Sequence, residues 1–205
     1  MTSLRYKPYP SNYYTHAGID AALALRKEGL NVDHIKSIHL EVAFPMFRTV
    51  GEPIERKRNP QTPYEAKFSA PYTVATALLG GTGLGVGLDD FTVENIQDTK
   101  RLALMQKIEV SSSAHCSAIF PEHAPAILTI ITQEGRQWIK EISLNRGSPE
   151  NPLSESELAL KFKSNSAHII KQNMTIEKLY DLVSTIDHLP NTDPLFDILK
   201  NIRKD

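Results

Sequence analysis

The chain is organised around a stretch of ten residues near its N-terminus, Lys7-Pro8-Tyr9-Pro10-Ser11-Asn12-Tyr13-Tyr14-Thr15-His16. This stretch combines a cation, an imidazole and three aromatic rings. Each proline fixes its own φ and disfavours a helical conformation in the residue before it. Lys7 and Tyr9 are therefore predicted to lie in a stiff, extended segment.

A helix is predicted to follow this segment, over residues 17–27. Apolar residues recur there at helical spacing, Thr15 is suited to cap the start and Gly29 to end it, so His16 falls in the first turn. The amide donors of a helix N-terminus, beside Lys7, suit a carboxylate or a phosphate. The alternative is a proline-rich lead-in whose lysine and histidine are simply solvated.

Composition excludes several classes of function. A chain of 205 residues is long enough for one good core, or for a compact domain with an extra helical arm. The formal charge of -1 and a single short basic run, Arg56-Lys57-Arg58, give no electrostatic basis for binding nucleic acid. No stretch approaches the roughly 18 consecutive apolar residues of a membrane span, and the N-terminus lacks the apolar core of a signal peptide. We therefore expect a cytoplasmic protein without a membrane partner.

Potential metal ligands are sparse in this sequence. The only cysteine, Cys116, excludes an intramolecular disulfide and fits a reducing compartment. The histidines are scattered and do not follow the spacing of a metal site. We expect no metal and no other cofactor.

Alternating apolar and polar residues predict strands. Ile38, Leu40 and Val42 alternate with polar neighbours, which is typical of a strand with one solvated face. Two further stretches, at 127–132 and 138–144, are separated by Glu134-Gly135 and predict a β-hairpin. Another extended piece is predicted to begin at Ile108.

Helices and loops are predicted from capping and turn residues. Thr62 as cap, Pro63 in the first turn and Glu65 completing a capping box predict a helix that runs to about Leu79. Pro71 is expected to kink this helix, and Lys67 beside the kink is a candidate functional cation. Residues 44–59 are expected to form a long loop and the glycine-rich residues 80–87 a flexible connector.

The final third carries further helix signals. Ser154 with Glu157 forms a capping box, Thr175 is expected to cap a second helix, and Asp193 begins a third. The predicted fold class is α+β: a small antiparallel sheet with helices packed on it, followed by C-terminal helices. We expect an α+β domain over residues 1–150 and a helical arm over residues 151–205.

Four motifs, in this order, resemble the C-terminal part of the MmgE/PrpD family. They are the stretch 7–16, Arg58-Asn59-Pro60-Gln61-Thr62-Pro63-Tyr64-Glu65-Ala66-Lys67-Phe68-Ser69, Asp89-Asp90-Phe91 and Asn151-Pro152-Leu153-Ser154. The family includes 2-methylcitrate dehydratase, cis-aconitate decarboxylase and iminodisuccinate epimerase, which act on small polycarboxylates without a metal. The resemblance implies the lid-like C-terminal domain of that fold, with the family's N-terminal helical domain absent from this chain.

The resemblance also implies roles for particular residues. Lys7 matches a lysine that lines the family's active site, and His16 matches its Thr-His, so both are candidate catalytic residues. Asn12 stands where the family can carry a histidine, and Phe47 where it has a tyrosine, which argues against cis-aconitate decarboxylase in particular. The candidate substrate-binding groups are Lys7, Ser11, Asn12, Phe47 and Lys67.

Two functions follow from the resemblance. The first is the C-terminal half of a lyase, dehydratase or isomerase that acts on a small polycarboxylate and needs a helical domain from elsewhere. The second is a truncated, inactive relative that persists as a binding or assembly module. In both cases we expect a homo-oligomer or a partner helical domain, because half of a two-domain site exposes an apolar face.

Overall fold

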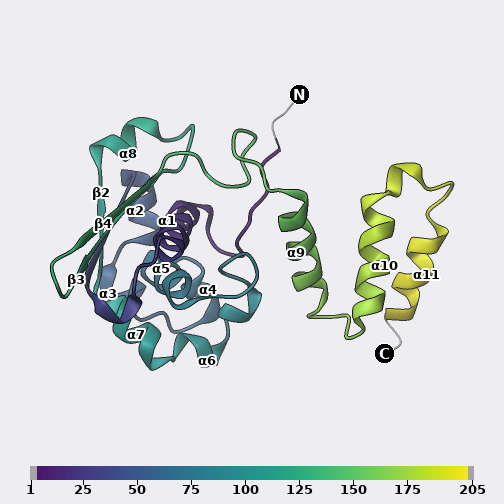
Figure 1. Cartoon of the computed structure of the whole chain (residues 1–205), viewed down its shortest axis with the longest axis horizontal. Helices are drawn as coiled ribbons and strands as arrows, with labels where there is room; N and C mark the ends of the chain where they lie inside the picture. Colours follow the sequence, from purple (N-terminus) through teal and green to yellow (C-terminus); the bar gives the residue numbers. More distant parts are fainter. Residues whose placement is uncertain (1–3, 203–205) are drawn as a thin grey trace. The chain divides into compact units, whose positions relative to one another are not determined.

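The computed structural model describes residues 4–202. The chain divides into two compact units, Met1–Leu153 and Ser154–Asp205. The first is an α+β unit with one four-stranded sheet, and the second is made of helices (Figure 1). Among the described residues, no helix is long and apolar enough to cross a membrane.

The sheet of the first unit is mixed. Its strands are β1 (Ile35–Val42), β2 (Ile108–Ser112), β3 (Ala126–Thr132) and β4 (Gln137–Ile142), in the order β2-β1-β3-β4. The predicted hairpin is confirmed, since β3 and β4 pair antiparallel, as do β1 and β3. The prediction of a purely antiparallel sheet is wrong, because β1 and β2 run parallel. A long, mostly helical connection between them provides the crossover that parallel strands require.

One face of this sheet packs against helices. Ile38 and Leu40 are buried, whereas His39 between them is exposed, as the alternation predicted. Helix α1 (His16–Lys27) lies against β3 and β4, and α5 (Ala70–Leu79) packs against α1. Figure 1 shows both helices on the same side of the sheet. The core therefore lies between the sheet and α1, with α5 as the next layer.

The segment predicted as a long loop contains two short helices instead. They are α2 (Phe44–Val50) and α3 (Ile54–Lys57), separated by a turn that contains Gly51 and Pro53. Helix α2 has a proline in its first turn. Proline is tolerated there because backbone amides in the first turn make no hydrogen bond within the helix. Neither helix is long enough to show a clear helical period, so the pattern gave no signal for them.

The predicted kinked helix consists of two helices, α4 (Pro63–Ala66) and α5. Thr62 caps α4 as predicted, but the chain leaves the helix at Lys67 and begins again after Ser69. The Ser69 side chain accepts a hydrogen bond from the Tyr72 amide and so caps α5. Pro71 therefore lies in the first turn of a new helix rather than at a kink.

A buried carboxylate holds the glycine-rich turn in place. Asp90 ends the short 3-10 helix η3 (Leu88–Asp90), and its Oδ2 accepts hydrogen bonds from the Thr82 amide, the Thr82 hydroxyl and the Gly87 amide at 2.8–2.9 Å. A Cβ on Gly81 would lie 2.5 Å from the Gly85 carbonyl oxygen. The turn is thus a closely packed structure that needs glycine, not a loose connector.

Short elements complete the first unit. Asp98 caps α7 (Thr99–Gln106) by accepting a hydrogen bond from the Arg101 amide. The remaining elements are η1 (Tyr13–Thr15), η2 (Val32–His34), α6 (Val93–Ile96) and α8 (Ala114–Ile119).

The second unit consists of α9 (Glu155–Ser166), α10 (Asn173–Ser184), the 3-10 helix η4 (Ile186–His188) and α11 (Asp193–Ile202). The capping box of Ser154 and Glu157 is confirmed. Thr175 does not cap a helix, because α10 begins earlier, after Gln172. Helix α10 contacts both α9 and α11, and its buried residues form the centre of a small separate core.

We expect Asp90→Ala to destabilise the first unit. The change removes a buried carboxylate and leaves three donors without their acceptor, so the free energy of unfolding should fall by at least about 2 kcal/mol. Denaturant unfolding followed by circular dichroism measures this. Asp89→Ala, at the exposed neighbouring position, is the matched control. Equal losses in the two variants would contradict the role of Asp90.

Candidate functional site

The stretch 7–16 forms a short connected scaffold on the first unit. The Tyr6 amide donates to the Gly147 carbonyl at 2.8 Å, which anchors the chain just before Lys7. Asn12 then caps η1, because its Oδ1 accepts from the Tyr14 amide, and η1 continues directly into α1. Thr15 occupies the N-cap position of α1 as predicted, but its side chain makes no capping hydrogen bond, and the Asn12 side chain caps η1 one turn earlier.

Tyr9 fastens this scaffold to the core. Its ring is fully buried, its hydroxyl donates to Asp20 on α1 at 2.5 Å, and it accepts from Arg146 at 2.8 Å. Burial, and then the charge of Asp20, raise the pKa of Tyr9 well above its usual range, although the Arg146 cation opposes them. Arg146 also donates to the Leu84 carbonyl at 3.3 Å, so it joins the glycine-rich turn to the scaffold.

His16 is fully buried at the start of α1. The rings of Tyr9 and Tyr13 each lie 5.3 Å from its ring, centroid to centroid, in edge-on orientations. This enclosure is suited to fixing the scaffold through ring packing. A catalytic role for His16 stays a prediction.

Ser11 and Asn12 occupy the turn between Tyr9 and η1. The Ser11 hydroxyl is buried and lies 2.8 Å from the Thr15 hydroxyl. The backbone amide of Asn12 donates a hydrogen bond to the backbone carbonyl of Lys67 at 2.8 Å. This bond links the scaffold to the junction between α4 and α5. The structure thus brings the first two sequence motifs together.

The other predicted site residues lie on two neighbouring segments. Lys67 is partly buried, and its Nζ is 5.6 Å from the centroid of the Phe91 ring, a cation–π distance. Phe47 lies on α2, which packs beside η1, and is partly buried against the core. Lys7 is exposed at the outer end of the scaffold. The structure joins Asn12 to Lys67 directly and places α2 beside them, while Lys7 lies at the solvent edge.

A second group of residues near this region was not predicted. Lys57 donates to the Thr49 carbonyl at 2.7 Å and to the Phe68 carbonyl at 2.9 Å, and so connects α2, α3 and the end of α4. Burial lowers the pKa of Lys57. It borders a cavity of about 290 Å³ together with Arg56 and Tyr64. Two ammonium bonds to backbone carbonyls indicate a mainly structural cation.

Sequence patterns also missed Arg146 and Asp20. Neither residue belongs to a motif. Arg146 is far from Tyr9 in the sequence, and only folding brings the two side chains together. Within the described part of the chain, no group of three or more His, Cys, Asp or Glu side chains is arranged to hold a metal ion.

The fold and this scaffold define a class: an α+β domain with a hydrogen-bonding turn just before its first helix, preceded by an exposed lysine. The comparison with known families agrees with the motifs. The model of the MmgE/PrpD C-terminal domain matches residues 9–184, most of the chain, and the protein belongs to the MmgE/PrpD family. The match begins two residues after Lys7. No curated protein matches the chain significantly.

We expect Tyr9→Phe to change how stability depends on pH. Because the pKa of folded Tyr9 is raised, the unfolded chain releases this proton first, near pH 10, and the wild type should lose stability as the pH rises from about 9 to 11. Tyr9→Phe should be less stable at pH 7, because Asp20 and Arg146 lose their shared partner, and should show a shallower decline above pH 9.

Urea unfolding at a series of pH values measures both effects. Tyr64→Phe, at an exposed tyrosine, is the control and should follow the wild type. Parallel stability curves for the wild type and Tyr9→Phe would contradict the raised pKa.

Proposed function

We propose that this chain is the C-terminal part of a lyase, dehydratase or isomerase that acts on a small polycarboxylate without a metal. The observation that carries the proposal is the hydrogen bond from the backbone amide of Asn12 to the backbone carbonyl of Lys67. It brings the turn of Ser11 and Asn12, in the same motif as Lys7, together with the junction that carries Lys67, in a chain of the MmgE/PrpD family.

The chemistry of such a reaction explains the need for cations. Removing a proton from the carbon next to a carboxylate builds up negative charge on that carboxylate. Donors and cations aimed at it stabilise the transition state more than the ground state. A polycarboxylate also needs counter-charges in order to bind at all.

Each residue then has a defined role. Lys7, exposed at the end of the scaffold, donates from Nζ to a substrate carboxylate. The Asn12 side chain uses its oxygen to cap η1, so its NH₂ group is the one that donates to substrate. Lys67 contributes a second positive charge, and Phe47 contributes an apolar wall. Ser11, whose hydroxyl is buried against Thr15, supports the turn.

His16 acts in this proposal by positioning. It is enclosed by Tyr9 and Tyr13, so its ring holds the turn of Ser11 and Asn12 that lies between these two tyrosines. The acid–base groups that move the substrate proton come from a helical domain in the same assembly.

Exposed apolar side chains support a covering partner. Tyr6, Phe44 and Tyr64 are each more than half exposed, and they lie on the segments that carry the proposed site residues. Large exposed apolar side chains near polar groups often mark a protein interface. We propose that a helical domain of the MmgE/PrpD type covers this surface and completes the site.

We expect the 205-residue chain alone not to turn over 2-methylcitrate or cis-aconitate, because these residues bind and orient but include no accessible acid–base pair. Adding a helical domain from a family member should restore proton exchange or turnover. Spectrophotometric assay of alkene formation and deuterium incorporation by NMR measure this. Turnover by the chain alone would contradict the division of roles. Failure of every complemented assembly, with the domains associated, would favour an inactive binding module.

We expect Lys7→Met to weaken binding of citrate-like tricarboxylates by the complemented assembly about tenfold. The loss corresponds to one charge-assisted hydrogen bond of about 1.5–3 kcal/mol, reduced by solvent exposure. Calorimetric titration measures it. Lys36→Met, which removes the same charge from an exposed position on β1, should bind as the wild type does. Equal affinities in both variants would remove Lys7 from the site.

A further inference from the structure

The helical unit contains a cavity of its own, separate from the residues discussed above. It has a volume of about 520 Å³ and is lined by the connection between α9 and α10, the first half of α10 and one side of α11. This volume is in the range of small-molecule sites. The cavity adjoins the small core of the helical unit, so its shape depends on residues that also stabilise that unit.

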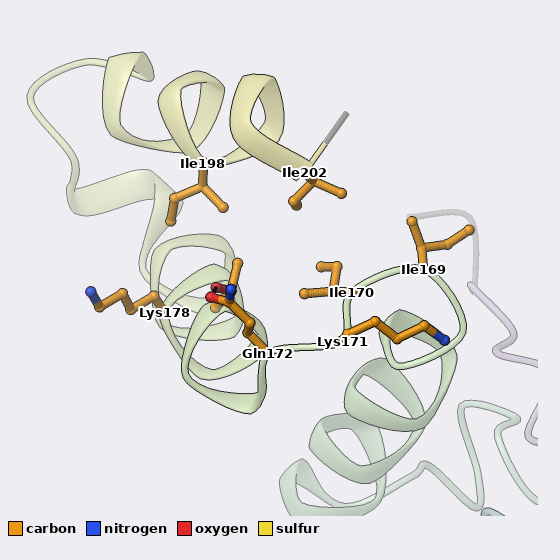
Figure 2. A pocket seen from close by; sticks show the side chains of 8 residues that line it. Ile169, Ile170, Lys171, Gln172, Lys178, Ile198 and Ile202 are labelled. Atoms are coloured by element: carbon orange, nitrogen blue, oxygen red, sulfur yellow. Dashed lines mark hydrogen bonds between the residues drawn. The ribbon is translucent and has the colours of Figure 1, made fainter. Parts of the chain in front are cut away.

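The two long walls of the cavity differ in character. On α11, Ile198 and Ile202 are one helical turn apart and point into the cavity (Figure 2). Facing them are Gln172, Thr175 and Lys178, which recur every three residues at the start of α10 and form a polar wall. The Thr175 hydroxyl donates to the Gln172 side-chain oxygen at 3.3 Å, within this wall.

Ile170 extends the apolar side of the cavity, and two lysines give its lining a positive charge. Ile170 is buried and lies beneath Ile202 (Figure 2). The described residues that line the cavity include two lysines and no acidic side chain. Lys178 and Lys171 extend outward in opposite directions at the border of the cavity (Figure 2), and neither forms an ion pair with another described residue. A partly apolar cavity bordered by two lysines and by no acidic side chain among the described residues favours an anion with an apolar part.

We propose that this cavity binds a free medium-chain fatty acid. The chain lies along Ile170, Ile198 and Ile202, and the carboxylate accepts hydrogen bonds from Lys178 and from the Gln172 side-chain NH₂ group, whose oxygen already accepts from Thr175. The carboxylate lies at Lys178 and not at Lys171, because Lys178 follows Gln172 and Thr175 along the polar wall and Gln172 offers a further donor. The proposal is independent of the function assigned to Lys7 and its neighbours.

Calorimetric titration of the full chain with hexanoate, octanoate and decanoate, kept below their micelle-forming concentrations, tests the proposal. We expect saturable binding of one molecule per chain, with affinity rising roughly threefold per added methylene as apolar surface is buried. Uncharged 1-decanol should bind about tenfold more weakly than decanoate. Absence of saturable decanoate binding, or equal affinity for the alcohol, would overturn the proposal.

Variants locate the site. Lys178→Gln should weaken decanoate binding about tenfold, and Ile202→Ala about fivefold. Lys200→Gln is the matched control, because Lys200 is an exposed α11 lysine outside the cavity lining that pairs with Asp197, and it should bind as the wild type does. Circular dichroism checks that each variant keeps its helices. If Lys178→Gln and Lys200→Gln bind equally, the carboxylate is not held by Lys178.

Other occupants give different results. If the cavity is a contact between two copies of the chain, sedimentation should show a dimer that Ile202→Ala weakens and that decanoate does not affect, and the fatty-acid proposal is then wrong. A dimer that decanoate disrupts in proportion to its occupancy supports the ligand. The same titration with citrate should show no binding at this site, since citrate has no apolar chain.

Discussion

The Tyr9 hydroxyl, buried between Asp20 and Arg146, is the interaction on which the arrangement of the first unit depends most. It connects the N-terminal stretch, the first helix and the segment after the sheet, and through Leu84 it reaches the glycine-rich turn. Two opposite charges share one neutral hydroxyl, which lets a charged pair lie close to the core without leaving the tyrosine oxygen unsatisfied. The position of the turn that carries Ser11 and Asn12 follows from this anchor.

Polar groups that tie separate segments together recur throughout the first unit. The Asp90 carboxylate closes the glycine-rich turn, and the Lys57 ammonium joins α2, α3 and the end of α4 through backbone carbonyls. Such groups fix geometry because a buried donor or acceptor without its partner costs about 1–3 kcal/mol. A surface that must hold a small, highly charged molecule in one orientation benefits from this rigidity.

The two units differ in the size of their buried cores. The first encloses a large core between a sheet and two layers of helices, and it carries the motifs of the MmgE/PrpD family. The second has only three buried apolar residues among those described, and many of its apolar side chains are half-exposed. A small helical unit of this kind gains stability from whatever fills or covers it. Its cavity and its exposed apolar side chains are therefore consistent with a binding role.

The sequence by itself determined those features whose signals lie within a few residues. The alternation from Ile38 to Val42, the hairpin around Gly135, and the caps at Thr62 and Ser154 all match the structure, because each depends on neighbours in the chain. The family motifs were also legible in the sequence.

Only the tertiary structure decided how distant residues meet. The parallel pairing of β1 with β2 and the contacts of Arg146 with Tyr9 and of Asn12 with Lys67 each join residues far apart in the chain. No local propensity encodes such a contact. It forms because burying the shared core fixes the path of the chain, and the polar groups along that path must then find partners.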